Sequence, residues 1–261
     1  MSGSDHVGYT EGFVAQVQLL WGEGFISPGG AGEVARAVEG VDLRDKEVLD
    51  VGVGLAGPAC LLVEAHGAAR VTGIDVQEAV LAKAATLVRD RGLAERIALR
   101  RVEPDGRLPF VDGSFDAVFS KETIVYVGDK AALFREAHRV LRPGGWLLVS
   151  DWYPGGRLTD AALEFWREAA GVRADLVPLE GQAALLARAG FVDVAATDRS
   201  AWYREASLRD ARRMRTTERA RIEAALGEAG AGNLIERARM TAAMVGRDWL
   251  RAGHLRGRKP G

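Results

Sequence analysis

Two carboxylates flank a short glycine-rich stretch early in the chain. Gly52, Gly54 and Gly57 form a G-x-G-x-x-G pattern after an apolar run and before a helical pattern, an arrangement in which a turn backbone approaches a ligand closely. Asp50 ends the apolar run two residues before the first of these glycines. A pyrophosphate at the following helix N-terminus would meet this carboxylate. We therefore expect a ligand with a cationic head at the loop.

A second acid ends the next apolar run. Asp75 follows residues 71–74 and lies 18 residues after Gly57, near the offset at which a strand-end carboxylate accepts hydrogen bonds from a ribose diol. A helix cap at Asp50 and a turn acid at Asp75 are alternative interpretations. Neither explains why two acids flank one loop, so the pair favours a cofactor that carries an adenosine.

The loop D-V-G-V-G-L-A-G, residues 50–57, resembles the first motif of class I S-adenosylmethionine-dependent methyltransferases, with Ala56 in place of the third glycine. The resemblance implies S-adenosylmethionine as cofactor. The loop would receive its methionine end, and an acid after the third strand would lie beside the adenine. Pro104 occupies the place where relatives often carry Asp, which leaves Glu103 or Asp105 for that role. The implied cofactor-binding residues around the loop are Asp50, Gly52, Gly54, Asp75, Val76 and Asp105.

A narrower resemblance lies nearer the N-terminus. The pattern Y-x12-G-E-x-x-I-S-x-G-G, which begins at Tyr9, resembles the opening of phosphoethanolamine N-methyltransferases. It implies that Tyr9 closes over the site as a catalytic residue. It also implies that Ile26 and Ser27 touch the cofactor.

The segment S-K-E-T-I-V-Y-V follows the expected fourth strand. Lys121, Glu122 and Tyr126 stand where the resembling family has arginine, aspartate and histidine. We expect Lys121 at the cofactor, and Glu122 and Tyr126 at the methyl acceptor, because a carboxylate or a phenol can orient an amine or receive its proton. The missing histidine keeps O- or C-methylation of a natural-product scaffold as an alternative.

Strand and helix patterns alternate along the chain, which predicts an α/β fold with a doubly wound, Rossmann-like parallel sheet. By resemblance the sheet has seven strands, and the last strand is antiparallel and lies beside the sixth. The helix-rich block at 203–249 interrupts the pattern, and we expect it to cover the site with residues 1–45 as a helical lid. The α/β core then spans 46–202, and the last strand and tail span 250–261. The expected strands are 47–51, 71–75, 97–102, 115–120, 146–151, 191–197 and 254–258.

Composition limits the function classes. The chain has 261 residues, of which 48% are hydrophobic, and a formal net charge of −1, which argues against a general nucleic-acid binder. It contains no apolar run long enough to span a membrane and no pattern of a signal peptide. The single cysteine, Cys60, suits a cytoplasmic protein. Four histidines without i, i+4 pairing predict no metal site.

The sequence therefore predicts an S-adenosylmethionine-dependent methyltransferase of a small polar acceptor, most simply an amine, and leaves the oligomeric state open. Two other classes remain: a nicotinamide-dependent oxidoreductase, against which Asp50 argues, and a non-catalytic cofactor-binding protein. Basic residues expected in the lid could recognise an acceptor anion; they are Arg173, Arg237, Arg239 and Arg247.

Overall fold

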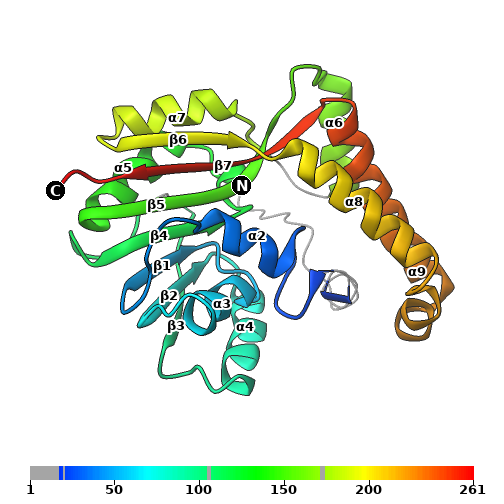
Figure 1. The fold of residues 1–261 in the computed structure, drawn as a ribbon, viewed down its shortest axis with the longest axis horizontal. Coiled ribbons are helices and arrows are strands. Elements are labelled where there is room, and N and C mark those ends of the chain that lie inside the picture. Colours follow the sequence, from blue (N-terminus) through cyan, green and yellow to red (C-terminus); the bar gives the residue numbers. More distant parts are fainter. Residues whose placement is uncertain (1–17, 20, 105–106, 171–173) are drawn as a thin grey trace, which may run out of the picture.

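The computed structural model describes residues 18–19, 21–104, 107–170 and 174–261. Within them, seven strands form one sheet in the order β3-β2-β1-β4-β5-β7-β6 (Figure 1). The strands are β1 Glu47–Val51, β2 Arg70–Asp75, β3 Ile97–Arg101, β4 Phe115–Lys121, β5 Leu141–Pro154, β6 Val192–Asp198 and β7 Leu250–Arg258. The helices are α2 Gly30–Ala37, α3 Gly57–Glu64, α4 Glu78–Asp90, α5 Lys130–Val140, α6 Asp160–Ala170, α7 Leu179–Arg188, α8 Ser200–Arg215 and α9 Arg219–Gly246, with a 3-10 helix, η1, at Ile124–Tyr126.

The five strands β1 to β5 run parallel, and β7 is antiparallel to both β5 and β6. This confirms the expected seven-stranded α/β fold with its inserted last strand. β7 begins at Leu250 and not at the expected His254, because its pairing with β5 continues as far as Pro154. β5 likewise begins at Leu141, which pairs with Phe115 ahead of a register shift.

Helices cover both faces of the sheet because the central strands are apolar on both sides. Val48 of β1 packs with α2, α3 and α4 on one face. Leu49, the next residue, packs with α5 and α7 on the other. The carboxyl ends of β1, β2 and β4 therefore lie between two packed layers, where open α/β sheets bind ligands. Cys60 lies buried in the first layer, and burial raises the pKa of its thiol to about 11.

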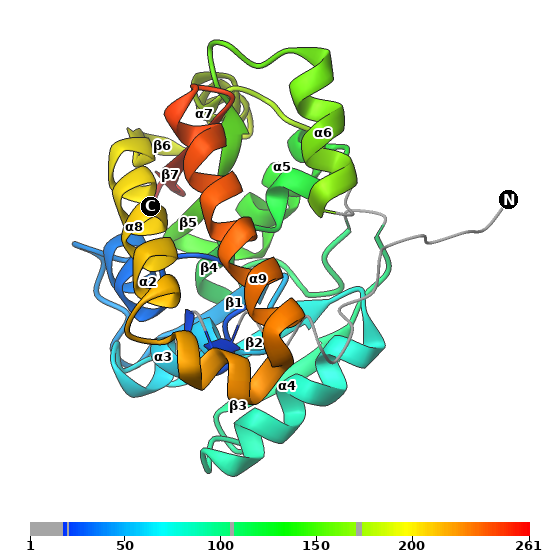
Figure 2. The same ribbon diagram turned by 90° about the vertical axis from the view of Figure 1, so that its right-hand side faces the viewer.

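Helices α8 and α9 form an antiparallel hairpin that projects beyond the sheet (Figure 1) and crosses in front of it in the view of Figure 2. The hairpin begins at Ser200, three residues before the expected boundary. At its base, Tyr203 and Met244 pack with Trp152 of β5. Farther out, Met214, Ile222 and Leu234 pack in a cluster that contains residues of the hairpin alone. Its action as a lid, and the domain boundaries expected with it, stay predictions.

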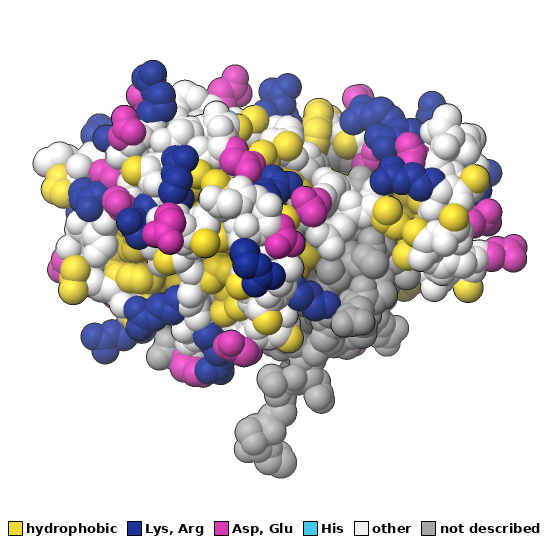
Figure 3. All heavy atoms as spheres, turned by 90° about the horizontal axis from the view of Figure 1, so that it is seen from below, with side chains coloured by type: hydrophobic (Ala, Val, Ile, Leu, Met, Phe, Trp, Pro, Cys, Tyr) yellow, Lys and Arg dark blue, Asp and Glu magenta, His cyan; other side chains and the backbone are white. Residues whose placement is uncertain are grey.

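On the face drawn in Figure 3, lysine and arginine side chains lie interspersed with aspartate and glutamate. No helix in the described part of the chain has both the length and the apolar content needed to cross a membrane. The cytoplasmic location stays a prediction.

Candidate active site

The glycine loop connects β1 to α3 through three residues with positive φ, namely Gly52, Gly54 and Ala56. Gly52 has φ 76° and Gly54 has φ 55°, conformations that favour glycine. A Cβ at Gly52 would overlap the side chain of Thr123, and one at Gly54 would lie 3.1 Å from Cδ1 of Ile26. A side chain at Gly52 or Gly54 would therefore both strain the backbone and crowd a neighbouring side chain.

Asp75 at the end of β2 holds the loop from the side. Its Oδ2 accepts a hydrogen bond of 3.1 Å from the Gly54 amide, and its Oδ1 accepts one of 3.0 Å from the Gln77 amide. Val76, half-buried, follows directly. Asp75 and the glycine loop therefore lie beside one another, and their binding of a cofactor stays a prediction.

Asp50 is buried beneath this loop, and its Oδ2 has no hydrogen-bond partner among the described residues. Burial, with a smaller contribution from the charge of Asp75, raises the pKa of the Asp50 carboxyl to about 8. A buried acceptor without a donor is costly. A cationic donor entering beside Asp50 would satisfy this oxygen and favour its charged form.

Residues 24–28 lie against the glycine loop. The Gly57 amide donates a hydrogen bond of 3.1 Å to the carbonyl of Gly24, and a Cβ at Gly57 would meet that carbonyl oxygen. Ile26 lies against Gly54. The Ile26–Ser27 pair expected at the cofactor is therefore adjacent to the loop.

Lys121 joins this segment to the end of β4. Its Nζ donates to Ser27 Oγ at 2.5 Å, to the Pro28 carbonyl at 2.8 Å and to Glu122 Oε1 at 3.0 Å. The side chains of Lys121 and Glu122 are only 3% and 10% exposed. A buried ion pair is stabilised by such additional hydrogen bonds. The lysine therefore pairs with the Glu122 carboxylate and also holds residues 27–28 in place.

Two further donors hold the carboxylate of Glu122. The indole Nε1 of Trp152 donates to Oε2 at 2.7 Å, and the hydroxyl of Tyr203 donates to Oε1 at 3.3 Å. Burial, followed by the charge of Glu122, raises the pKa of Tyr203 well above its ordinary value, so the phenol keeps its proton. Glu122 itself has φ 52°, an uncommon conformation for a residue with a side chain.

A cavity of about 140 Å³ opens beside Glu122. Its walls come mainly from aromatic and apolar side chains of β5, α6, α9 and residues 21–28. Its polar lining residues are Glu122, Tyr126, Arg237 and Thr241. Burial lowers the pKa of Arg237. The apolar and aromatic lining residues are Trp21, Ile26, Pro28, Trp152, Trp166, Leu234, Met240, Met244 and Leu250.

Residues 49–149 match the family model described as "Methyltransferase domain". The chain contains a methyltransferase domain. This confirms the family expected from the glycine loop and the fourth-strand segment. The chain is 30% identical over 207 residues to phosphoethanolamine N-methyltransferase 1 of Arabidopsis thaliana, covering 79% of this chain and 41% of the relative. It is 32% identical over 170 residues to sterol 24-C-methyltransferase ERG6B of Gibberella zeae, covering 60% and 44%.

Among solved structures, phosphoethanolamine N-methyltransferase 2 of Haemonchus contortus superposes with a TM-score of 0.89 at 24% identity. The match covers 98% of this chain and 59% of that one. That structure holds phosphomonomethylethanolamine and S-adenosylhomocysteine. The chain spans about two fifths of the length of the curated relatives named above.

The residues predicted for this methyltransferase domain fall into two adjoining groups. The first contains Asp50, Gly52, Gly54, Asp75 and Val76 at the loop. The second contains Ile26, Ser27, Lys121, Glu122 and Tyr126. Thr123 joins them, since its Oγ1 donates to the Gly52 carbonyl at 3.4 Å. Tyr9, Asp105 and Arg173 lie outside the described residues.

Other candidates have different surroundings. Glu103, the alternative adenine-side acid, is exposed and pairs with Arg101 at 2.8 Å. Arg239 pairs with Glu236 on the surface, and the guanidinium of Arg247 lies over the ring of Trp249. Of the proposed anion-recognising arginines that the structure describes, only Arg237 lines the cavity beside Glu122.

Sequence reasoning missed most of the cavity wall. Leu234, Arg237, Thr241 and Met244 recur at spacings of three and four on α9, which places them on one helix face. That periodicity was the available signal, although it does not tell which face turns to the site. Trp21 carried no comparable signal.

Proposed function

We propose that this chain transfers the methyl group of S-adenosylmethionine to the nitrogen of a small amine. The observation that carries the proposal is the buried Asp50, whose Oδ2 has no partner in the described part of the chain. It lies under a glycine loop whose Gly54 amide donates a hydrogen bond to Asp75. A cofactor with a cationic methionine end and a ribose fits both acids.

The cofactor-binding residues of the proposal are those around the loop and the segment against it. Asp50 would accept from the cofactor's ammonium group, and Asp75 would accept from the ribose diol. Ile26, Ser27 and Lys121 border the loop on the acceptor side. When bound, S-adenosylmethionine supplies an electrophilic methyl group.

Glu122 and its neighbours are the acceptor side. The carboxylate attracts an ammonium ion, and its three donors fix the orientation in which it does so. The rings of Trp21, Trp152 and Trp166 line the same cavity and can stabilise a methylated ammonium through their π faces. An amine must be neutral when it attacks, and Glu122 is positioned to take its proton while Tyr126, and Tyr9 by resemblance, orient the nucleophile.

A second candidate is O- or C-methylation of a larger scaffold. The cavity walls favour this candidate because they contain more aromatic and aliphatic side chains than polar ones. A sterol C-methyltransferase is among the relatives. An acceptor with an extended apolar body would bury more of these walls than a small zwitterion would.

The test is an acceptor panel of primary and methylated amines, alcohols, phenols and activated carbon acids, assayed for S-adenosylhomocysteine release. Carbon-13 methyl donor then identifies the methylated atom by NMR. N-methyl product that Glu122→Gln abolishes and the exposed control Glu95→Gln retains would support the proposal. Exclusively O- or C-methyl product would favour the second candidate. Cofactor binding without turnover on any acceptor, or binding of a nicotinamide cofactor instead, would overturn both.

A further inference from the structure

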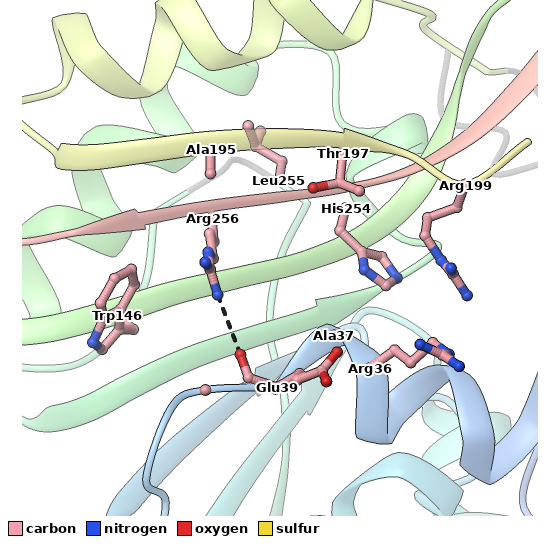
Figure 4. Close-up of a pocket in the computed structure, with 11 residues that line it drawn as sticks. Arg36, Ala37, Glu39, Trp146, Ala195, Thr197, Arg199, His254, Leu255 and Arg256 are labelled. Carbon is pink, nitrogen blue, oxygen red and sulfur yellow. Dashed lines mark hydrogen bonds between the residues drawn. The ribbon is translucent and has the colours of Figure 1, made fainter.

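A second and larger cavity, of about 580 Å³, lies on the sheet face between α2 and the β5-β7-β6 strands (Figure 4). None of its lining residues lines the cavity beside Glu122. It takes side chains from the strand faces, not from the strand ends where the methyltransferase site lies. The charged residues that line this cavity therefore have no role in the methyltransferase site described above.

Three arginine guanidinium groups and one imidazole converge on this cavity. Arg36 reaches it from α2, Arg256 and His254 from β7, and Arg199 from the residue before α8. In Figure 4 the side chains of Arg36, Arg199 and His254 point into the same space between helix and sheet. Arg36 lies more than two hundred residues before His254 and Arg256 in the chain.

Most of their donors have no acidic partner within the described residues. Arg36 forms no ion pair with any of them. Arg256 donates to the backbone carbonyl of Glu39 at 3.2 Å and stacks 5.7 Å above the ring of Trp146. Arg199 donates through one terminal nitrogen to Glu33 at 3.2 Å, while its Nε is buried without an acceptor.

The acids nearby do not balance these charges. Glu33 is fully buried and already bonds Arg199 and His254, the latter at 2.6 Å. Among the residues that line the cavity, Glu39 supplies the carboxylate. Three arginines against two acids leave a positive cavity even with a neutral His254. Planar guanidinium groups match oxyanions by paired hydrogen bonds, and a cavity lined by positive charge concentrates anions.

We propose that this cavity binds a small organic oxyanion, a phosphate ester or a polycarboxylate, at a site separate from the methyl acceptor. The volume is that of a small-molecule site and larger than an inorganic ion needs. Trp146, Ala195 and Leu255 supply an apolar wall for the organic part. Arg36, Arg199 and Arg256 hold the anionic group.

The proposed site adjoins the elements that hold the methyltransferase site. Glu33 belongs to α2, which follows Ser27 and Pro28, and Arg199 immediately precedes α8, which carries Tyr203. Lys121 donates to the Pro28 carbonyl, and the Tyr203 hydroxyl lies 3.4 Å from the same oxygen. An anion that contacts Arg199 therefore binds at the junction of α2, α8 and β7.

The experiment is calorimetric titration of the full chain with pyrophosphate, and separately with citrate, at pH 7 and low ionic strength. S-adenosylhomocysteine is kept saturating so that the glycine loop is occupied. The test variant is the double substitution Arg36→Gln with Arg256→Gln, because both side chains are exposed and neither has a carboxylate partner in the described residues. The matched control is Arg135→Gln, an exposed arginine on α5 at the opposite face.

We expect the double variant to bind the better of the two probes at least about tenfold more weakly, since each charge-assisted hydrogen bond contributes more than one factor of ten. Arg135→Gln should bind like the unmodified chain. Added salt should weaken anion binding to the unmodified chain and to Arg135→Gln. Absence of measurable binding of either probe, or equal affinity in the double variant and the control, would overturn the proposal. Thermal unfolding without anion checks that the double variant is folded.

Discussion

The two principal carboxylates of the site have opposite surroundings. Asp50 is buried with one oxygen unpartnered in the described residues, and its pKa is raised to about 8. Glu122 accepts from Lys121, Trp152 and Tyr203. Different surroundings give chemically identical groups different roles. Asp50 is suited to charge only when a cation arrives, and Glu122 is suited to stay in one fixed orientation.

Asp50 should release a proton when the cofactor binds. At pH 7 a carboxyl with a pKa of about 8 is largely protonated, and a neighbouring ammonium group favours its charged form. Calorimetry of S-adenosylhomocysteine binding in buffers of different ionisation enthalpy should detect a release approaching about one proton per ligand. The affinity should rise between pH 6 and 8. Asp50→Asn should bind more weakly and lose this buffer dependence, whereas an unchanged buffer dependence would assign the proton elsewhere.

Trp152 should act through its indole N–H. Trp152→Phe keeps an aromatic ring in the cavity wall but removes the 2.7 Å hydrogen bond to Glu122, an interaction with a charged group that contributes about 1.5–3 kcal/mol. We expect kcat/KM for the acceptor to fall roughly tenfold to a hundredfold, with little change in cofactor affinity. Trp146→Phe, which alters a tryptophan away from this site, is the control. Equal kcat/KM values in the two variants would make Trp152 a packing residue.

Local spacing could predict some of these residues and not others. Asp50, Gly52, Gly54 and Asp75 lie on strand ends and one loop, so their arrangement follows from a short segment and the parallel sheet. The partners of Glu122 depend on distant packing: Tyr203 lies 81 residues further along the chain. Tyr203 reaches Glu122 only when α8 is correctly oriented against the sheet. The pattern of residues within α8 does not specify that orientation.

The α8–α9 hairpin combines a base fixed to the sheet with an outer part that packs on itself. Tyr203 and Met244 join the cluster around Trp152, whereas Met214 and Leu234 belong to the outer cluster. A segment with few contacts to the main core has a low free energy of local opening. This is the property expected of an element that admits a substrate and then covers it.

Gly227 should determine the shape of the outer hairpin. It interrupts the helical geometry of α9 with φ 71° and ψ 170°, a conformation accessible essentially to glycine alone. A Cβ there would meet no atom within 4 Å, so the cost of Gly227→Ala is confined to the backbone, at roughly 1–3 kcal/mol. Gly232→Ala, in a regular helical turn and also in open space, should instead stabilise by about 0.5–1 kcal/mol. Urea unfolding of both variants measures the difference, and the same sign for both would contradict this account.

Over the whole molecule, the pKa values of buried carboxyls are shifted in opposite directions, depending on their hydrogen-bond partners. Burial raises the pKa values of Asp50 and Asp151 to about 8 and about 7. Burial would also raise that of Glu33, but hydrogen bonds from His254 and Arg199 outweigh it and lower the pKa. The stability contributed by Glu33 is therefore present above the ordinary carboxyl pKa and is lost on acidification. Asp50 and Asp151 contribute stability that is lost as pH rises.

The free energy of unfolding without ligand should therefore decrease between about pH 5 and pH 8. Across that window the folded chain holds protons on Asp50 and Asp151 that the unfolded chain has released, which gives a slope of at most about 1.4 kcal/mol per pH unit for each group. Denaturant unfolding at pH 5, 6.5 and 8 measures it. Asp50→Asn should show a smaller decrease over the same range, and a slope as steep as in the unmodified chain would exclude Asp50 as its source.

The overall architecture was more predictable than the site because it depends on repeated patterns. Alternating apolar runs such as Glu47–Val51 specified the parallel strands, and β1 was predicted with the bounds observed. Strand ends that depend on pairing, such as Leu250 opposite Pro154, required the partner strand to be in place. The basic cavity beneath β7 could not be foreseen, because Arg36, Arg199 and Arg256 meet only after the sheet is assembled.

The position of β7 also affects how the protein is made. β6 has β7 as its neighbour in the sheet, but a ribosome produces β6 first and then the whole α8–α9 hairpin before residues 250–258 emerge. Until then the newly made chain has β6 without a partner and β5 with an open edge, where unpaired backbone groups favour association with other chains. β7, which is translated after the hairpin, thus inserts between two strands that are already made, β5 and β6. For a nascent chain of this protein, the exposed interval lasts as long as the translation of the hairpin.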